Sequence, residues 1–205
     1  MNIKKIGKII SLIFIIAGII LISGKREWFP DFYNPFFMGV MAFVSAFLVS
    51  SPRLFLKPNN PEQEKVLDSV QTGAILVLSL NALGALGLFQ LYKLGFQYDR
   101  FIHFLNSFIF TIIFAKAYGQ WFKASFEKSV ILAMAIIFLV GAGWEIYEFV
   151  GDGLFKTEMA GIYGKFVTED TFWDLIMNLL GIIVAAISLI VFRKKESLLF
   201  SNSRE

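Results

Sequence analysis

The stretch SVILAMAIIFLVGAGWEIYEFVGD, residues 129–152, decides the fold of this chain. Its first part is almost wholly apolar, and three carboxylates, Glu145, Glu148 and Asp152, then follow within eight positions. A run of about 20 mostly apolar residues is long enough to cross a bilayer as a helix. The stretch therefore predicts a membrane-spanning helix that ends in a cluster of acids.

Five further segments have the same length and apolar character. The chain is 57 % apolar, above the roughly 45–50 % of soluble domains. In lipid only a helix satisfies its own backbone within one segment. We therefore expect an all-α, polytopic membrane helix bundle with about six transmembrane helices, forming a single integral membrane domain over residues 1–205 and beginning with a retained helix rather than a cleaved signal. The expected spans are about 6–23, 33–50, 70–92, 100–118, 129–150 and 172–192.

The distribution of basic residues predicts the orientation of this bundle. Of the 19 Lys and Arg residues, 13 fall at the membrane face shared by the two termini and 6 at the opposite face. Basic residues are enriched on the cytoplasmic side of membrane proteins, so both termini are expected to be cytoplasmic. The segments around Asp99, Glu145 and Asp170 then lie together at the outer face.

Composition and missing motifs exclude several classes of protein. The chain has no cysteine and one histidine, which excludes disulfides, thiolate metal sites and cysteine nucleophiles. The net charge of +3 is too small and too dispersed for a nucleic-acid-binding protein. No H-E-x-x-H motif, serine nucleophile elbow or phosphate-loop lysine occurs, and no organic cofactor is evident. The sequence leaves open whether the protein is an enzyme.

Three of the predicted helices carry polar residues at helical spacing near the outer face. The fourth opens with YDRFIHFLNSF (98–108), the fifth closes with GWEIYEFVGD (143–152), and the sixth opens with EDTFWDLIMNLLG (169–181). Residues three, four, seven or eight apart share one face of a helix. The three polar stripes are Asp99, His103 and Asn106 on the fourth helix, Glu145, Glu148 and Asp152 on the fifth, and Asp170, Asp174 and Asn178 on the sixth.

Ordinary interfacial helix ends explain only part of this pattern. Asp99 and Asp170 lie at helix N-termini, where the helix dipole favours acids, and Asp152 can simply belong to a loop. Glu145 and Glu148 lie at a helix C-terminus, where the dipole disfavours anions. Other members of the stripes lie deeper, where an acid at mid-membrane costs at least about 2.5–3.5 kcal/mol and is by default a functional candidate. We therefore expect the three stripes to form one site.

The crowded carboxylates require neutralisation, because several of them cannot all stay ionised in a low dielectric. The first hypothesis is a bound divalent cation, and one imidazole among many oxygens favours Mn, Fe, Mg or Ca over Zn. Such an ion can act on the phosphoryl or carbonyl group of a lipid or cell-envelope substrate. The candidate metal ligands are His103, Asp99, Glu145, Glu148, Asp170 and Asp174, and all of these except Asp170 are also candidate catalytic residues.

Two other hypotheses use the same residues. In the first, the acids and His103 form the proton relay of a small proton-coupled transporter. In the second, the acidic outer pocket belongs to a non-catalytic binding protein and captures a cation or an amine. Asn106, Asp152 and Asn178 are supporting polar residues in each case. Metal content separates the cation hypothesis from the proton relay.

The same three motifs resemble those of the YjdF-like inner-membrane proteins, a bacterial family of unknown function. The resemblance covers roughly residues 70–192, and a shorter D-x-x-x-H-F and D-x-x-x-N-x-x-G pattern is remotely similar to the VanZ-like membrane proteins. The matching residues are Asp99, Arg100, His103, Phe104, Glu145, Glu148, Asp170, Thr171, Asp174, Asn178 and Gly181. The resemblance implies a multi-pass protein of the bacterial cytoplasmic (inner) membrane. Membrane lipid is the expected partner, nucleic acid is not, and a homo-oligomer stays open.

Overall fold

Six long helices make up most of the protein, as a computed structural model shows. The structure describes residues 2–29, 34–155, 159 and 167–202, with the backbone alone for 194–202, and these residues contain no strand. The long helices are α1 (Ile3–Ser23), α2 (Pro35–Phe55), α3 (Pro61–Ala85), α4 (Tyr98–Phe122), α5 (Phe126–Phe155) and α6 (Val167–Asn202), with short 3₁₀ helices η1 (Arg26–Trp28) and η2 (Leu88–Leu94). Each long helix is long and apolar enough to cross a membrane, which confirms the predicted all-α polytopic bundle.

Asparagine side chains determine where three of these helices begin. Oδ1 of Asn2, Asn34 and Asn60 accepts a hydrogen bond from a backbone N–H two or three residues later. Pro35 and Pro61 then occupy the first helical positions, where the missing N–H is not needed. As a result α3 begins at Pro61 rather than near residue 70, because the capped, polar first turns continue the membrane helix outward.

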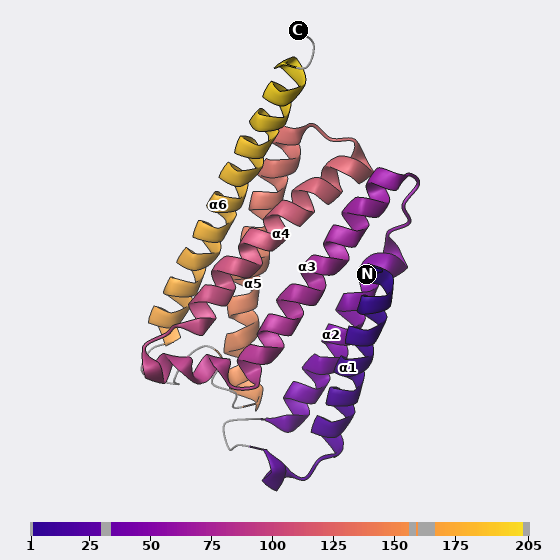
Figure 1. The fold of residues 1–205 in the computed structure, drawn as a ribbon. Coiled ribbons are helices and arrows are strands. Elements are labelled where there is room, and N and C mark those ends of the chain that lie inside the picture. Colours follow the sequence, from indigo (N-terminus) through magenta and orange to yellow (C-terminus); the bar gives the residue numbers. More distant parts are fainter. Residues whose placement is uncertain (1, 30–33, 156–158, 160–166, 203–205) are drawn as a thin grey trace.

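The end of α3 also differs from the expected span 70–92. The helix ends at Ala85, and Gly87 adopts a φ of +135°, which L side chains rarely adopt. The following residues form η2, which runs across the end of the bundle rather than along it (Figure 1). The apolar run therefore continues past the helix, but the glycine redirects it.

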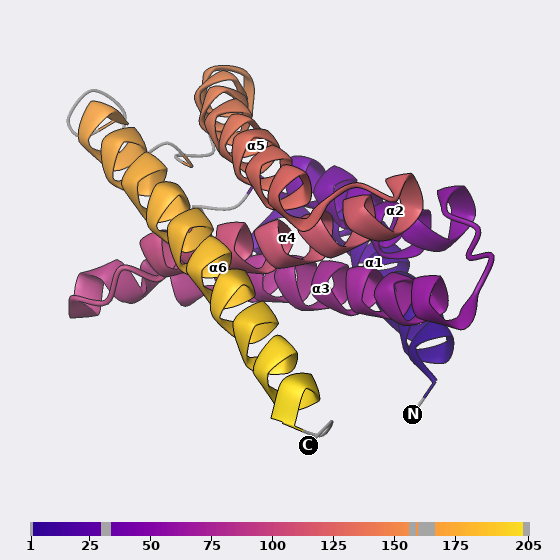
Figure 2. The same ribbon diagram turned by 90° about the horizontal axis from the view of Figure 1, so that it is seen from above.

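Successive long helices run antiparallel, so three polar stripes meet at one end of the bundle (Figure 1). Helix α4 packs against α3, α5 and α6, whereas α1 and α2 form a pair that contacts α3 (Figure 2). The start of α4, the end of α5 and the start of α6 share one end, which we call the acidic end (Figure 1). The first residues of α1 and the last of α6 lie toward the opposite end.

The sidedness of the bundle stays a prediction from the distribution of basic residues. The antiparallel arrangement is compatible with that prediction, because it separates the acidic end from both ends of the chain (Figure 1). Three of the basic residues counted, Lys156, Lys165 and Arg204, lie outside the described residues.

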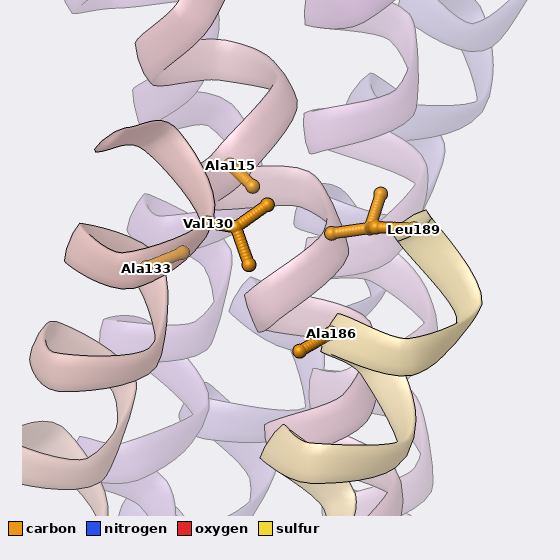
Figure 3. Packing of buried hydrophobic residues seen from close by; sticks show 5 residues of the cluster. All are labelled: Ala115, Val130, Ala133, Ala186 and Leu189. Atoms are coloured by element: carbon orange, nitrogen blue, oxygen red, sulfur yellow. The ribbon is translucent and has the colours of Figure 1, made fainter. Parts of the chain in front are cut away.

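Small apolar side chains close the contact between α4, α5 and α6 in the half of the bundle away from the acidic end. This inner apolar cluster consists of Ala115 from α4, Val130 and Ala133 from α5, and Ala186 and Leu189 from α6. Their side chains lie between the three helices (Figure 3). Small residues permit close helix packing in a membrane, so apolar side chains fill this half of the three-helix contact.

Gly181 permits a close contact between α4 and α6 nearer the acidic end. A Cβ at this position would overlap the backbone oxygen of Phe104 and lie 3.1 Å from the backbone nitrogen of Phe108. Only glycine therefore fits here without moving a helix backbone. This contact sets the spacing between the two helices that carry His103 and Asp174.

Gln71 connects α1, α2 and α3 at the end of the bundle opposite the acidic end. It is buried, its Oε1 accepts a 2.6 Å hydrogen bond from Nε of Arg53, and its Nε2 donates to the backbone oxygen of Val49 at 3.3 Å. It also packs against Gly7 of α1, where a Cβ would overlap the Gln71 amide. One side chain therefore holds three helices together.

Replacing Gln71 by leucine is expected to lower the free energy of unfolding by about 1–3 kcal/mol, because it removes the two hydrogen bonds that Gln71 makes with Arg53 and with the backbone oxygen of Val49. Thermal unfolding of the purified protein in detergent measures this. Gln97→Leu is the matched control, since Gln97 is exposed and makes no capping hydrogen bond. Equal melting temperatures for the two variants would contradict the prediction.

Candidate functional site

Helix α4 places the only histidine of the chain at the centre of the acidic end. His103 is 6 % exposed, its Nε2 lies 3.7 Å from Oδ1 of Asp99, and its Nδ1 lies 3.5 Å from Oε1 of Glu145. Asp99 precedes it by one helical turn, whereas Glu145 comes from α5. The imidazole therefore lies between two carboxylates from different helices, one at each ring nitrogen.

Helix α5 contributes Glu145 and Glu148, which are both buried. Oε1 of Glu148 accepts a 2.6 Å hydrogen bond from the indole nitrogen of Trp144, one turn earlier. The side chain of Thr171 from α6 lies close to the Glu145 carboxylate. These neutral groups lie beside the two carboxylates without supplying a positive charge.

Helix α6 contributes Asp174 and Asn178. Asp174 is 1 % exposed, and Asn178 joins α6 to α4 through two contacts. Oγ of Ser107 donates to Oδ1 of Asn178 at 2.7 Å, and Nδ2 of Asn178 lies 3.3 Å from Nδ1 of His103. On the α5 side, Gly141 leaves room for this amide, because a Cβ there would lie 2.8 Å from Nδ2.

The three stripes converge, as the sequence indicated. Side-chain ligand atoms of Asp99, His103 and Asp174 lie within 4.8 Å of one another, and so do those of His103, Glu145 and Glu148. The two groups share His103, so they form one continuous cluster across α4, α5 and α6. Five of the six candidate metal ligands therefore come together.

Several oxygens of this cluster have no hydrogen-bond partner. They are Oε1 of Glu145, Oε2 of Glu148 and Oδ1 of Asp174, each shielded from solvent. A buried acceptor left unpaired is costly, and more so when it carries charge. The three oxygens come from two helices and belong to residues grouped around the same histidine, so either a proton or a cation would satisfy them.

Asp170 and Asp152 lie next to the cluster rather than within it. Asp170 is half-buried and lies within electrostatic range of Asp99, Arg100 and His103. Asp152 is buried, and its Oδ1 accepts a 2.7 Å hydrogen bond from the backbone N–H of residue 159. Neither contributes an atom to the two groups of ligand atoms that meet around the histidine.

Ser107, rather than Asn106, continues the α4 stripe toward α6. Ser107 contacts Asn178, whereas Asn106 is half-buried and its Oδ1 has no partner. The row of residues at i, i+4 and i+8 slopes across a helix surface, and α6 crosses α4 obliquely (Figure 2). The buried face therefore follows the row of four and continues to Thr111, a spacing already present in the sequence.

Comparison with known proteins identifies the family. A family model described as "Predicted membrane protein (DUF2238)" matches residues 8–195. The chain belongs to this family. The DUF2238 match includes at least part of each of the six helices, and the whole cluster of His103 and its acidic neighbours.

One relative extends this comparison to a curated protein. An uncharacterized protein of Thermotoga maritima is 32 % identical to the DUF2238 chain over 120 residues, which is 55 % of this chain and 57 % of the relative. The chain thus spans little more than half the length of that relative. No solved structure matches the chain. The YjdF-like resemblance is consistent with DUF2238 membership, whereas the VanZ-like resemblance is not shown.

Proposed function

We propose that this membrane protein binds a divalent cation at the acidic end. His103, Glu145 and Glu148 are the principal ligands. Asp174, which groups with His103 and Asp99, supplies a further carboxylate beside them from α6. The observation that carries this proposal is the group of buried carboxylate oxygens around His103 that have no hydrogen-bond partner.

The spacing of the ligand atoms within each group fits one ion. Bonds from Mg²⁺, Mn²⁺ or Ca²⁺ to oxygen are about 2.0–2.6 Å long, so two ligands of one ion lie at most about 4–5 Å apart. The ligand atoms of each group lie within 4.8 Å of one another. A site of this size closes around an ion with small side-chain adjustments. Its oxygen-rich composition favours Mn, Fe, Mg or Ca over Zn.

The hydrogen bonds of His103 select Nδ1 as the coordinating nitrogen. Oδ1 of Asn178 accepts from Ser107, so the Asn178 amide directs its Nδ2 toward Nδ1 of His103 at 3.3 Å. If Nδ1 accepts this hydrogen bond, the proton of the neutral imidazole is on Nε2. That N–H then points toward Asp99. A carboxylate that accepts the second N–H of a ligand histidine orients the ring and raises its basicity. Asp99 therefore acts as the positioning residue, and the cation replaces the long Asn178 contact.

The location of the site favours a class of substrate on which the bound cation would act. Exposed aromatic side chains, among them Trp173 and Phe172, flank it, as is typical of the membrane–water interface. A cation held there would polarise a phosphoryl or carbonyl group of a lipid or cell-envelope substrate and activate water. The basic-residue distribution and the YjdF-like resemblance favour the outer face of a bacterial cytoplasmic membrane for this chemistry.

The inner apolar cluster supports a cation site rather than a proton relay across the membrane. Described buried polar side chains on α4 extend from His103 to Thr111, about 12 Å along the helix. Beyond Thr111, Ala115 and its apolar neighbours fill the contact between α4, α5 and α6 (Figure 3). A relay needs titratable groups or water through this layer, so a one-sided site agrees better with the packing.

Metal analysis of the purified protein tests the proposal. Wild-type protein is loaded with Mn²⁺ in detergent without chelator and passed through gel filtration, and its metal content is then measured. We expect about one Mn²⁺ per chain. Binding to the folded state alone also stabilises it, so the melting temperature should rise on loading and fall again after chelation.

Two outcomes would overturn the proposal. One is wild-type protein that stays metal-free after exposure to Mn²⁺, Fe²⁺, Mg²⁺ and Ca²⁺ in turn. The other is proton flux through reconstituted vesicles that depends on His103 and does not change when divalent cations are removed. The second result would establish the proton-coupled transporter instead.

A further inference from the structure

Arg100 occupies an unusual position at the edge of the acidic cluster. It follows Asp99 on α4, and its guanidinium carbon lies 5.3 Å from the ring centroid of Trp173 on α6. Its Nε is shielded from solvent and has no hydrogen-bond partner. Stacking on an aromatic ring uses the face of a guanidinium and leaves the N–H groups at its edge free for an acceptor.

Nearby acids do not use these N–H groups. Asp99, Asp170 and Asp174 all lie within electrostatic range of Arg100. Nevertheless, Arg100 forms no ion pair within 4.0 Å with a described residue, whereas His103 lies within that distance of two carboxylates. A guanidinium that served only to neutralise the cluster would be expected to pair with one of them. Its guanidinium instead lies against the ring of Trp173.

We propose that Arg100 and the cation together bind a phosphate group. This inference rests on the proposed cation site and names the ligand class that the site accepts. The planar fork of arginine matches two phosphate oxygens, and a divalent cation takes another. Without the cation the acidic cluster repels an anion, so the cation binds first and phosphate second.

The surroundings of Arg100 favour a phosphate at the depth of lipid headgroups. Phe101, Phe172 and Trp173 are 42 %, 57 % and 39 % exposed and lie in the first turns of α4 and α6. Exposed aromatic residues at a helix end are typical of the membrane interface. A lipid headgroup and free phosphate present the same chemistry to Arg100, so the experiment compares the two.

Phosphorus NMR of the Mn²⁺-loaded protein tests this inference. Protein in a phosphate-free maltoside detergent, freed of excess Mn²⁺, is titrated with inorganic phosphate in one series and with dioctanoyl phosphatidic acid in another. Bound Mn²⁺ broadens the ³¹P resonance of a ligand that binds next to it. We expect saturable broadening with wild-type protein, and tighter binding of the phosphatidic acid if the natural ligand is a lipid.

Arg100→Gln is expected to weaken phosphate binding at least about tenfold while the Mn²⁺ content stays close to one per chain. Arg100→Lys keeps the charge but loses the planar fork, so we expect an intermediate affinity. Lys93→Gln is the matched control, because it removes an exposed positive charge in η2. It should bind phosphate as the wild type does.

The possible failures of the two proposals are distinguishable. If Mn²⁺ binds but phosphate is not broadened, or if Arg100→Gln broadens it as the wild type does, the phosphate inference is wrong and the cation site stands. The same holds if Arg100→Gln only tightens Mn²⁺ binding, because Arg100 is then a counter-ion. If no Mn²⁺ binds to the wild type, both proposals fail.

Discussion

Replacing both Glu145 and Glu148 by glutamine is expected to abolish Mn²⁺ binding, with a loss in affinity of more than about 100-fold. Glutamine preserves the shape of the side chain but removes the negative charge that a cation requires. Loss of a residue that only orients a ligand typically lowers metal affinity about 10–100-fold, and this variant removes two ligands. Mn²⁺ content after gel filtration and a titration followed by electron paramagnetic resonance measure the effect.

The same double variant should unfold at a higher temperature than metal-free wild type. Both carboxylates are buried and each has an oxygen without a hydrogen-bond partner, so neutral amides relieve a desolvation penalty in the empty site. Functional sites commonly carry such a stability deficit. Mn²⁺ should then stabilise the wild type and leave the variant unchanged.

Two comparison variants sharpen this prediction. Asp99→Asn should lower Mn²⁺ affinity by about 10–100-fold without abolishing binding, because in the proposed site Asp99 orients His103 and is not itself a ligand. Glu169→Gln is the matched control, since Glu169 is an exposed acid in the first turn of α6, at the acidic end of the bundle. Unchanged Mn²⁺ content in the Glu145→Gln/Glu148→Gln double variant would show that the cluster is not a metal site.

Replacing Gly181 by leucine is the second change for which we expect a large effect. A side chain here would overlap the backbone of α4 at Phe104, and backbone atoms cannot move aside as a flexible side chain can. Overpacking a well-packed core costs about 1–3 kcal/mol and occasionally more. In this case α4 and α6 must separate, so the protein should melt at a markedly lower temperature or fail to yield a monodisperse peak in detergent.

Gly143→Leu is the matched control for this substitution. Gly143 lies in α5, and a Cβ there would meet nothing within 4 Å. Leucine should therefore be tolerated, and it favours the helix over glycine by close to 1 kcal/mol. Gly181→Ala should fall between the two and retain enough folded protein to measure its Mn²⁺ content, which we expect to be reduced. Equal stability of the Gly181→Leu and Gly143→Leu variants would contradict this account of the α4–α6 contact.

Much of the candidate site was predictable because it depends on local spacing. The acids and the histidine recur at three or four residues on three apolar segments, and antiparallel neighbours place alternate helix ends on the same side. This reasoning identified Asp99, His103, Glu145, Glu148 and Asp174, whose ligand atoms the structure brings together in two overlapping groups. It also predicted Asp170 as a metal ligand, and this residue lies next to the cluster rather than within it.

The residues that support the cluster were harder to predict. Thr171 and Trp144 place beside the carboxylates ordinary polar groups that any interfacial helix can carry. The stripe predicted on α4 contains Asn106 rather than Ser107. Steps of seven and eight residues from Asp99 both return to nearly the same face of an isolated helix, so the spacing alone does not distinguish the two. Only the oblique crossing of α6 over α4 selects one of them (Figure 2).

The sequence by itself determined the class of protein, the existence of six apolar helices and the polar stripe on each of three helices. These follow from hydrophobic length and from helical periodicity, which are local properties of the chain. The tertiary structure decided the start of α3, the close contact at Gly181, the nitrogen of His103 that faces Glu145, and the stacking of Arg100 on Trp173. A helix that is apolar on every side does not specify which face meets a neighbour. Packing between helices makes that choice.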